Sequence, residues 1–292
     1  TELGLQQTLA TRLLNLGYIS PASSHNKAIP AILKGASLLV GSPLGAGFTE
    51  SAMISIINLS TTQAQSSHAY IILSASEDHK HIYEQRLKLL VGDEIPMDII
   101  TNLERFIAPT TQATILISTP QEFHNYLEQS STNREISYTL LLTETDEMVA
   151  RGAKPQLLAL STYLSKTCQT IICTSKITKS VKAISRSLQH KPKWFTLGPN
   201  NKETENIAHQ AWPVPKTMKD QLLLKLSSKL HSTKVIILVN GEKYATKLAR
   251  RMRTRKLSAT AVRAVDESEI YSRFESNDIQ MLILPGKLNQ SI

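Results

Sequence analysis

The sequence predicts an α/β protein in which parallel strands are covered by helices on both faces of each sheet. Short apolar runs such as residues 69–73 and 170–173 are continuous rather than alternating, as in strands that are buried on both faces. Stretches with helical spacing of apolar residues, such as 77–91, lie between these runs. A polar stretch with several prolines interrupts the alternation near residues 196–215. It predicts two domains in this chain of 292 residues.

Each predicted element is an apolar run bounded by polar residues or a stretch with helical periodicity. In residues 1–195 we expect strands over 37–41, 69–73, 113–117, 139–142 and 170–173, and helices over 2–16, 50–59, 77–91, 120–129 and 155–166. We also expect a helix that includes residue 28 and ends before the first strand. In residues 216–292 we expect strands over 235–239, 259–262 and 279–284, and helices over 218–230, 242–256 and 266–275. Because the sequence ends soon after this third strand, the second domain is expected to be incomplete.

A glycine-bearing loop follows the first predicted strand. The strand leads to Gly45, Ala46 and Gly47, and a helix begins directly after them, at Phe48 and Thr49. A strand, a Gly-x-Gly loop and a helix form the layout of a phosphate-binding loop, because backbone N–H groups and the helix N-terminus attract an anion. That chemistry also needs a lysine after the last glycine, and this chain has Phe48 there. The loop is therefore interpreted as a degenerate nucleotide-binding site.

The residues around this loop resemble the opening motifs of the DEAD-box RNA helicases. Segments 17–21 (GYISP), 28–30 (AIP) and 33–35 (LKG) match those motifs in both residue type and spacing. The adenine-reading glutamine of the family falls on His25, and its A-x-T-G-x-G-K-T loop reads SPLGAGFT at 42–49. The resemblance implies two RecA-like domains, each a parallel sheet flanked by helices, the second of them incomplete. We expect the first over residues 1–195, a linker over 196–215 and the second over 216–292.

Later motifs of the family have counterparts that lack groups acting on ATP. Segment 139–148 (TLLLTETDEM) falls where the family has LVLDEADRML. The magnesium-holding aspartate corresponds to Thr143, which we therefore count among the residues of the degenerate nucleotide site. The water-polarising glutamate remains as Glu144, and Asp146 follows two residues later. Without the lysine and the aspartate, phosphoryl transfer lacks both of its charge-neutralising groups. The resemblance thus implies a degenerate member with damaged ATPase motifs. Glu144 and Asp146 are vestigial, no catalytic residue or metal site is expected, and no cofactor is expected.

Phe48 is expected to fill the cleft that a nucleotide would otherwise occupy. A large apolar side chain at the start of a helix is stabilised by burial, and an empty cleft beside it offers that burial.

Charge is distributed unevenly along the chain. Residues 1–150 hold 8 Lys and Arg against 15 Asp and Glu, whereas residues 151–292 hold 25 against 9, a balance of +16. Such an excess indicates nucleic acid or another polyanion as a partner. In the family's RNA clamp of the first domain, Glu77 and Glu122 stand where arginines are expected, which opposes phosphate binding there. The candidate RNA-binding residues are therefore Arg250, Arg251, Arg253, Arg255 and Lys256, placed on one predicted helix, together with Lys176, Lys179, Lys182 and Arg186.

These features favour a catalytically inactive DEAD-box-like protein that acts as an RNA-binding or structural subunit of a ribonucleoprotein assembly. Its expected partners are ribosomal or messenger RNA and the proteins of that assembly, and no membrane is expected. Two alternatives stay open: an active, divergent ATP-dependent RNA helicase that uses ATP and magnesium, and a protein-interaction scaffold without RNA contact. Trp194 and Trp212, at or beside the linker, are interpreted as covering a domain edge rather than stacking on bases.

The composition bears on the compartment. The chain is basic, is rich in Ser, Thr, Asn, Lys and Ile, and has only two cysteines, Cys168 and Cys173. A chain with so few cysteines fits a reducing compartment. We expect the mitochondrial matrix, with the nucleus or nucleolus as the alternative.

Overall fold

The computed structural model divides into two compact units, Thr1–Ile207 and Ala208–Ile292. The division falls inside the stretch expected to be a linker, 196–215. Residues 197–207 and 209 of that stretch lie outside the described residues. The structure describes residues 2–43, 45–62, 68–106, 113–129, 137–164, 168–196, 208, 210–230, 233–263 and 267–286.

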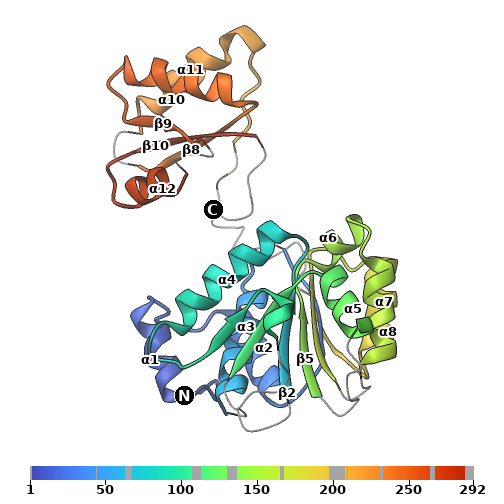
Figure 1. The fold of residues 1–292 in the computed structure, drawn as a ribbon. Coiled ribbons are helices and arrows are strands. Elements are labelled where there is room, and N and C mark those ends of the chain that lie inside the picture. Colours follow the sequence, from blue (N-terminus) through green and yellow to red (C-terminus); the bar gives the residue numbers. More distant parts are fainter. Residues whose placement is uncertain are drawn as a thin grey trace. The chain divides into compact units, whose positions relative to one another are not determined.

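Unit 1 is built on a parallel sheet of seven strands within the described residues, in the order β3-β4-β2-β5-β6-β1-β7 (Figure 1). The strands are β1 (Leu38–Gly41), β2 (His68–Leu73), β3 (Asp98–Ile100), β4 (Thr114–Ser118), β5 (Ser137–Leu142), β6 (Gln169–Thr174) and β7 (Lys193–Thr196). The helices are α1 (Gln7–Asn15), α2 (Ser23–Leu33), α3 (Phe48–Thr62), α4 (Glu77–Val91), α5 (Pro120–Gln129), α6 (Thr145–Ala150), α7 (Lys154–Tyr163) and α8 (Lys179–Leu188), with a short 3-10 helix at Leu103–Arg105.

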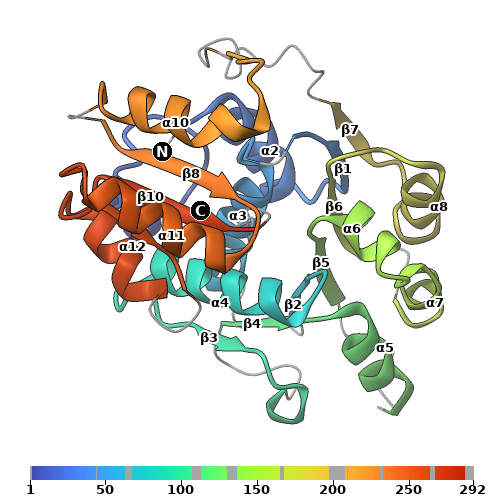
Figure 2. The same cartoon turned by 90° about the horizontal axis from the view of Figure 1, so that it is seen from above.

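Helices cover both faces of this sheet, as Figure 2 shows. One core cluster joins the sheet to α1, α2, α3 and α4, and the other joins it to α5, α6, α7 and α8. Neighbouring residues of one strand enter different clusters: Ile71 lies in the second and Ile72 in the first, and both are fully buried. This explains the continuous apolar runs of the sequence, because each strand is buried on both of its faces.

Most predicted elements of unit 1 are present with shifts of a few residues at their ends, but four were not predicted. They are β3, α6, α8 and β7. Strand β7 ends at the first residue of the predicted linker; it is short, β1 is its only partner among the described strands, and Pro192 precedes it. Helix α8 begins with a hydrogen bond from the backbone N–H of Val181 to the side chain of Thr178, 3.2 Å long. It buries Val181, Ile184 and Leu188 on one side.

Unit 2 contains a smaller parallel sheet, with described strands in the order β8-β10-β9. These are β8 (Val235–Val239), β9 (Ala259–Ala261) and β10 (Met281–Pro285), and the helices are α10 (Lys219–Ser227), α11 (Glu242–Arg253) and α12 (Glu267–Glu275), with a 3-10 helix at Lys216–Met218. Helices α10 and α11 share one core cluster with the sheet, and α12 packs in a second cluster with Leu282 and Leu284. Helix α11 was expected to continue to residue 256, but it ends at Arg253.

Both cysteines are free and buried at the centre of unit 1. Cys168 directly precedes β6, and Cys173 lies within that strand, which is paired with β5 on one side and β1 on the other. Burial raises the pKa of the Cys173 thiol to about 12, and a hydrogen bond with Thr49 opposes this only in part. These thiols are therefore protonated at neutral pH and shielded from reagents. Among the described helices, none has the length and apolar character that crossing a bilayer requires.

Candidate nucleotide and nucleic-acid sites

The glycine loop keeps the backbone form of an anion-binding loop. Gly45 and Gly47 have φ angles of 81° and 78°, in the left-handed region that favours glycine. Helix α3 begins directly after them, at Phe48. A Cβ atom on Gly47 would lie 2.9 Å from Ser24 Oγ, so the loop passes close to the start of α2. Backbone geometry alone therefore suits an anion here.

Phe48 does not face an anion; it is part of the core. The residue is 3% exposed and belongs to the cluster beneath α1–α4. Its ring is stacked on that of Phe195 in β7, with centroids 6.2 Å apart and planes inclined by 24°. The position that requires a cation for nucleotide binding is thus occupied by a buried ring that is stacked on a half-buried one. The sequence indicated the loss of the lysine, but nothing in it identified Phe195 as the partner.

Thr143 is equally committed to internal contacts. It follows β5 directly and is 0% exposed. Its Oγ1 donates a hydrogen bond of 2.9 Å to the carbonyl oxygen of Leu73 at the end of β2, and its backbone N–H donates to the same oxygen at 3.1 Å. A hydroxyl in this arrangement ties two strand ends together. It offers no carboxylate for the water shell of a magnesium ion.

Glu144 is held by a tyrosine that sequence reasoning missed. The hydroxyl of Tyr83, on α4, donates a hydrogen bond to Glu144 Oε1, and His79 Nδ1 lies 3.7 Å from Glu144 Oε2. Burial raises the pKa of Tyr83, and the Glu144 carboxylate raises it further, so the phenol stays a donor. Glu144 itself has a left-handed backbone, with a φ angle of 33°. One oxygen of its carboxylate is therefore hydrogen-bonded to α4, and the other is buried without a hydrogen-bond partner among the described residues.

The carboxylate of Asp146 accepts three hydrogen bonds from residues at the end of β6 and directly after it. Its Oδ1 accepts hydrogen bonds from Thr174 Oγ1 at 2.9 Å and from the backbone N–H of Ser175 at 3.0 Å, and its Oδ2 accepts one from Ser175 Oγ. Burial alone would raise the pKa of Asp146, but these hydrogen bonds outweigh it and lower that pKa. The start of α6 is thereby joined to the end of β6. Asp146 thus connects α6 to β6, whereas the described hydrogen bond of the Glu144 carboxylate runs to α4.

His25 takes a structural position beside the loop. Its Nδ1 accepts a hydrogen bond of 3.2 Å from the backbone N–H of Ala22 at the start of α2, and its Nε2 is buried without a partner. Burial lowers the pKa of His25, although Glu50 opposes this, so the ring is neutral at pH 7.

Taken together, these positions do not fit a magnesium-bound nucleotide. The loop supplies N–H groups and a helix N-terminus, but the cation is replaced by the buried ring of Phe48 and the metal-holding carboxylate by the hydroxyl of Thr143. Among the described residues, no group of three or more His, Cys, Asp and Glu side chains could hold a metal ion.

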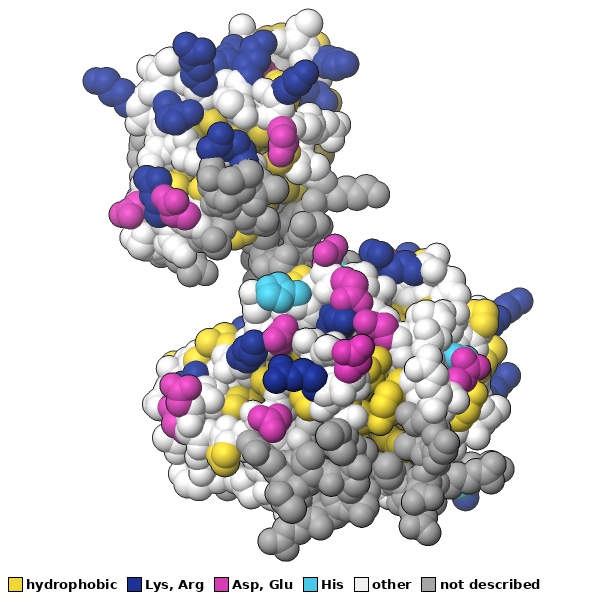
Figure 3. Space-filling model, in the orientation of Figure 1, with side chains coloured by type: hydrophobic (Ala, Val, Ile, Leu, Met, Phe, Trp, Pro, Cys, Tyr) yellow, Lys and Arg dark blue, Asp and Glu magenta, His cyan; other side chains and the backbone are white. Residues whose placement is uncertain are grey.

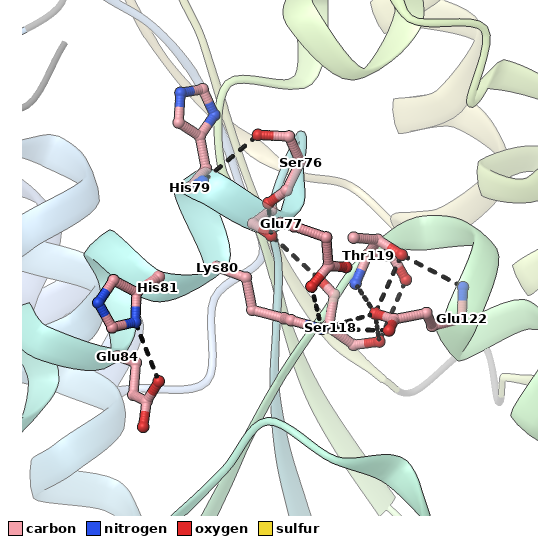
Figure 4. Close-up of polar contacts among 10 residues, drawn as sticks. Ser76, Glu77, His79, Lys80, His81, Glu84, Ser118, Thr119 and Glu122 are labelled. Atoms are coloured by element: carbon pink, nitrogen blue, oxygen red, sulfur yellow. Dashed lines mark hydrogen bonds and ion pairs between the residues drawn. The ribbon is translucent and has the colours of Figure 1, made fainter. Parts of the chain in front are cut away.

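The segment expected to form the RNA clamp of the first domain contains an internal ion-pair cluster, shown in Figure 4. Lys80 Nζ lies 2.7 Å from Glu77 Oε2 and 3.1 Å from Glu122 Oε1. Glu122 Oε2 also accepts hydrogen bonds from the backbone N–H of Thr119 at 3.0 Å and from Ser118 Oγ at 3.2 Å. The Lys80 side chain is only 11% exposed. The cluster therefore joins the starts of α4 and α5 through a buried cation.

The charges of this cluster are stabilised mutually. Burial alone would lower the pKa of Lys80, but Glu77 and Glu122 outweigh it and raise that pKa. Burial alone would raise the pKa of Glu122, but the N–H of Thr119 and Lys80 outweigh it and lower that pKa. Figure 3 shows acidic side chains gathered over this part of unit 1. The only cation in the cluster is thus already neutralised by two carboxylates, so it is not free to bind a phosphate.

The predicted basic residues of unit 2 fall into two groups. Arg250 and Arg253 are exposed on α11, and Arg255 and Lys256 are exposed in the turn after it, so the five cations do not all lie on one helix. Arg251 is different, because its guanidinium pairs with Asp220 of α10, which also accepts a hydrogen bond from Tyr244. Basic side chains gather over α10 and α11 in Figure 3.

The predicted basic residues of unit 1 lie on α8 and in the loop before it. Lys176 is exposed in that loop, and Lys179, Lys182 and Arg186 are exposed along the outer side of α8. Positions 179, 182 and 186 lie close together around a helix, so they form one stripe.

Known proteins agree with this architecture. The model of the DEAD/DEAH box helicase family matches residues 23–184, which is 162 of the 292 residues. The chain therefore belongs to the DEAD/DEAH box helicase family. The DEAD-box ATP-dependent RNA helicase RhpA of Helicobacter pylori is 20% identical over 97% of this chain, and the chain spans 59% of that helicase. Eukaryotic initiation factor 4A of Dictyostelium discoideum is 22% identical over the whole chain, which spans 74% of that factor.

Solved structures show the same fold. Dbp5 of S. cerevisiae, in a complex with Gle1 and IP6, superposes with a TM-score of 0.77 at 16% identity, over 100% of this chain and 75% of Dbp5. A DEAD box protein from Methanococcus jannaschii superposes with a TM-score of 0.69 at 16% identity, over 97% of this chain and 78% of that protein. The expectation of an α/β protein with two RecA-like domains is confirmed.

Proposed function

We propose that this chain is a DEAD-box-type protein that does not hydrolyse ATP and serves as an RNA-binding, structural subunit of a ribonucleoprotein assembly. The observation that carries the first part is the burial of Phe48 against Phe195 at the position of the phosphate-binding cation. Thr143 and Glu144 support it, since both are engaged in contacts within unit 1. An ATPase needs the corresponding groups free to act on the nucleotide and on water.

Calorimetry with MgATP tests the loss of ATP binding. Losing two charge-assisted contacts costs ~3–6 kcal/mol at ~1.5–3 kcal/mol each, which is a loss of affinity of roughly 150- to 20,000-fold. We therefore expect no binding at micromolar MgATP and no phosphate release, with or without poly(U). Micromolar binding would overturn the proposal.

The RNA-binding part rests on charge. Residues 151–292 have a balance of +16, and cations on and after α11 are exposed. Neutralising Arg250, Arg253, Arg255 and Lys256 to glutamine is expected to flatten the plot of log K against log salt by about 0.7 per lost contact. Arg251→Gln is the matched control, because it removes the same charge from a side chain already paired with Asp220. Its salt slope should equal the wild-type value. An unchanged slope in the fourfold variant would contradict phosphate binding by this surface.

Two other functions have support of their own. An active, divergent helicase that uses ATP and magnesium is favoured by the retained contacts of Asp146 with Thr174 and Ser175 and by the relatives named as ATP-dependent RNA helicases. ATP turnover in the assay above would establish it. A scaffold without RNA contact is favoured by the Lys80 cluster, which places carboxylates at the expected clamp. Ultraviolet crosslinking to cellular RNA distinguishes the RNA-binding subunit from the scaffold, because a scaffold without RNA contact gives no crosslink.

For the compartment we propose the mitochondrial matrix. The basic composition with two cysteines supports it. Fractionation of cells with antibody detection tests this, and a signal confined to the nucleus would place the protein in the alternative compartment.

A further inference from the structure

The edge strand β7 exposes a tryptophan on the side of the sheet covered by α8. Trp194 pairs in register with Leu39, and Phe195 pairs with Val40. Leu39 belongs to the core cluster of α5–α8, and Val40 to that of α1–α4. Paired residues of parallel strands lie on the same face of the sheet. Phe195 is therefore turned inward, toward Phe48, whereas Trp194 lies on the α8 face, where it is 53% exposed.

The end of α8 is fixed beside this tryptophan. Gln189, the residue that follows α8, donates hydrogen bonds from Nε2 to the carbonyl oxygens of Leu38 at 2.7 Å and Thr170 at 2.8 Å. Its Oε1 accepts a hydrogen bond of 2.6 Å from Ser185 Oγ. The end of α8 is thus held at the level of Leu38, one residue from the partner of Trp194, and only residues 189–192 separate α8 from β7.

Exposed cations lie on the helix that covers the same face of the sheet as the tryptophan. Lys182 and Arg186 are exposed on α8, whereas Lys193 pairs with Leu38 and so lies on the opposite face of the sheet from Trp194. Residues 151–200 contain nine Lys and Arg and no Asp or Glu. The described helix α6, which contacts α8, carries acidic residues, but Asp146 is bound to Ser175, and Glu147 pairs with Arg151 at 2.9 Å. An exposed indole beside exposed cations combines the two elements with which proteins hold single-stranded nucleic acids.

We propose that the α8–β7 face of unit 1, formed by Lys182, Arg186 and Trp194, binds single-stranded RNA, with an unpaired base stacked on Trp194 and the phosphates beside the cations. This inference deepens the proposed RNA-binding function and rests on it. It places the RNA away from the clamp position of the family, where Lys80 is engaged by Glu77 and Glu122. A single strand is specified because only an unpaired base offers its face to an aromatic ring.

Fluorescence provides the test, since the chain has two tryptophans. In a Trp212→Phe background, Trp194 is the only one, and a stacked base quenches its emission. We expect a 12-nucleotide oligouridylate to quench this emission. We also expect Trp194→Ala to weaken oligouridylate binding between about 5-fold and 100-fold, because an aromatic platform contributes that much by alanine substitution. Trp194→Phe should retain most of the affinity, since a phenyl ring still stacks. Trp212→Ala, at a similarly exposed tryptophan of unit 2, is the matched control and should leave the affinity unchanged.

A second measurement separates the cations from the ring. The double variant Lys182→Gln and Arg186→Gln should reduce the slope of log K against log salt by roughly 1.4, at about 0.7 per single-strand contact. A 12-base-pair RNA duplex should give no quenching. If the wild-type protein binds oligouridylate and Trp194→Ala binds it equally well, this inference fails and the proposed RNA-binding function stands. If the wild-type protein binds no RNA at all, both fail. Equal quenching by the duplex would also overturn the stacking geometry.

Discussion

Replacing Phe48 with lysine restores the residue type that a phosphate-binding loop requires, yet the structure predicts loss of stability rather than gain of activity. Phe48 is almost fully buried and stacked on Phe195. Removing a buried phenyl side chain costs ~3–5 kcal/mol. A lysine stem recovers part of the apolar contact, but its ammonium must be desolvated or must distort the loop to reach water. We expect a net loss of ~3 kcal/mol in the free energy of unfolding of unit 1.

This loss is measurable by thermal unfolding. For a unit of about 200 residues, 1 kcal/mol corresponds to a Tm shift of ~2–4 °C, so Phe48→Lys should lower Tm by ~6–12 °C. Phe48→Leu is the control; it keeps an apolar side chain of lower volume and should lose only ~1 kcal/mol. The lysine variant should also fail to bind MgATP, because Thr143 still replaces the metal-holding carboxylate. A lysine variant as stable as the leucine variant, or one that binds MgATP at micromolar concentration, would refute the reasoning.

Three further predictions concern the polar contacts of unit 1. Lys80→Met leaves the carboxylate of Glu122 without its cation and should lower the free energy of unfolding by ~1–3 kcal/mol. This is less than the ~3–5 kcal/mol of a fully buried pair, because the Glu122 side chain is 39% exposed. An unchanged midpoint of chemical unfolding would contradict this prediction. The pKa values of Asp146 and Glu122 are lowered in the folded state, so the stability they contribute is present above their unfolded values of about 4 and is lost as pH falls through the lower folded values. Asp146→Asn should therefore make the urea midpoint fall less steeply between about pH 5 and 2, and an identical pH profile would count against this assignment. Tyr83→Phe removes the hydrogen-bond donor to Glu144 and should lower the free energy of unfolding by ~1.5–3 kcal/mol without producing ATP turnover. ATP turnover by this variant would contradict the prediction and show that the tyrosine alone restrains Glu144.

The fold was predictable because its strands are buried on both faces. The run of β2 is apolar from Ala69 to Leu73 and that of β5 from Leu140 to Leu142, and stretches with helical periodicity separate such runs. The glycine loop and the replacements at Phe48 and Thr143 could also be read directly, since they depend on local spacing. Strand β7 could not, because it is an edge strand of four residues whose only described partner, β1, lies far away in the sequence.

The partners of the site residues depend on the order of strands in the sheet, and sequence periodicity does not determine that order. Tyr83 reaches Glu144 across 61 positions, and Lys80 reaches Glu122 across 42. Both contacts arise because β2, which precedes α4, lies between β4 and β5. A basic stripe on a helix is visible in sequence, but the neutralisation of Arg251 by Asp220 requires the packing of α10 on α11.

The two buried thiols near the ends of β6 allow the opening of unit 1 to be followed by the rate of thiol modification. The chain has no other cysteine, so any reaction with a thiol reagent reports exposure of that central strand and is blind to unit 2. When unit 1 recloses faster than its exposed thiols react, the modification rate equals the equilibrium population of the locally unfolded (open) form multiplied by the intrinsic reactivity of a thiol. RNA bound at the proposed α8–β7 face would slow this rate by the factor 1 + [RNA]/Kd, because a ligand of the closed form depletes the open one. The rate at which a thiol reagent labels Cys168 and Cys173 would therefore measure the proposed affinity of unit 1 for RNA without a label on the RNA.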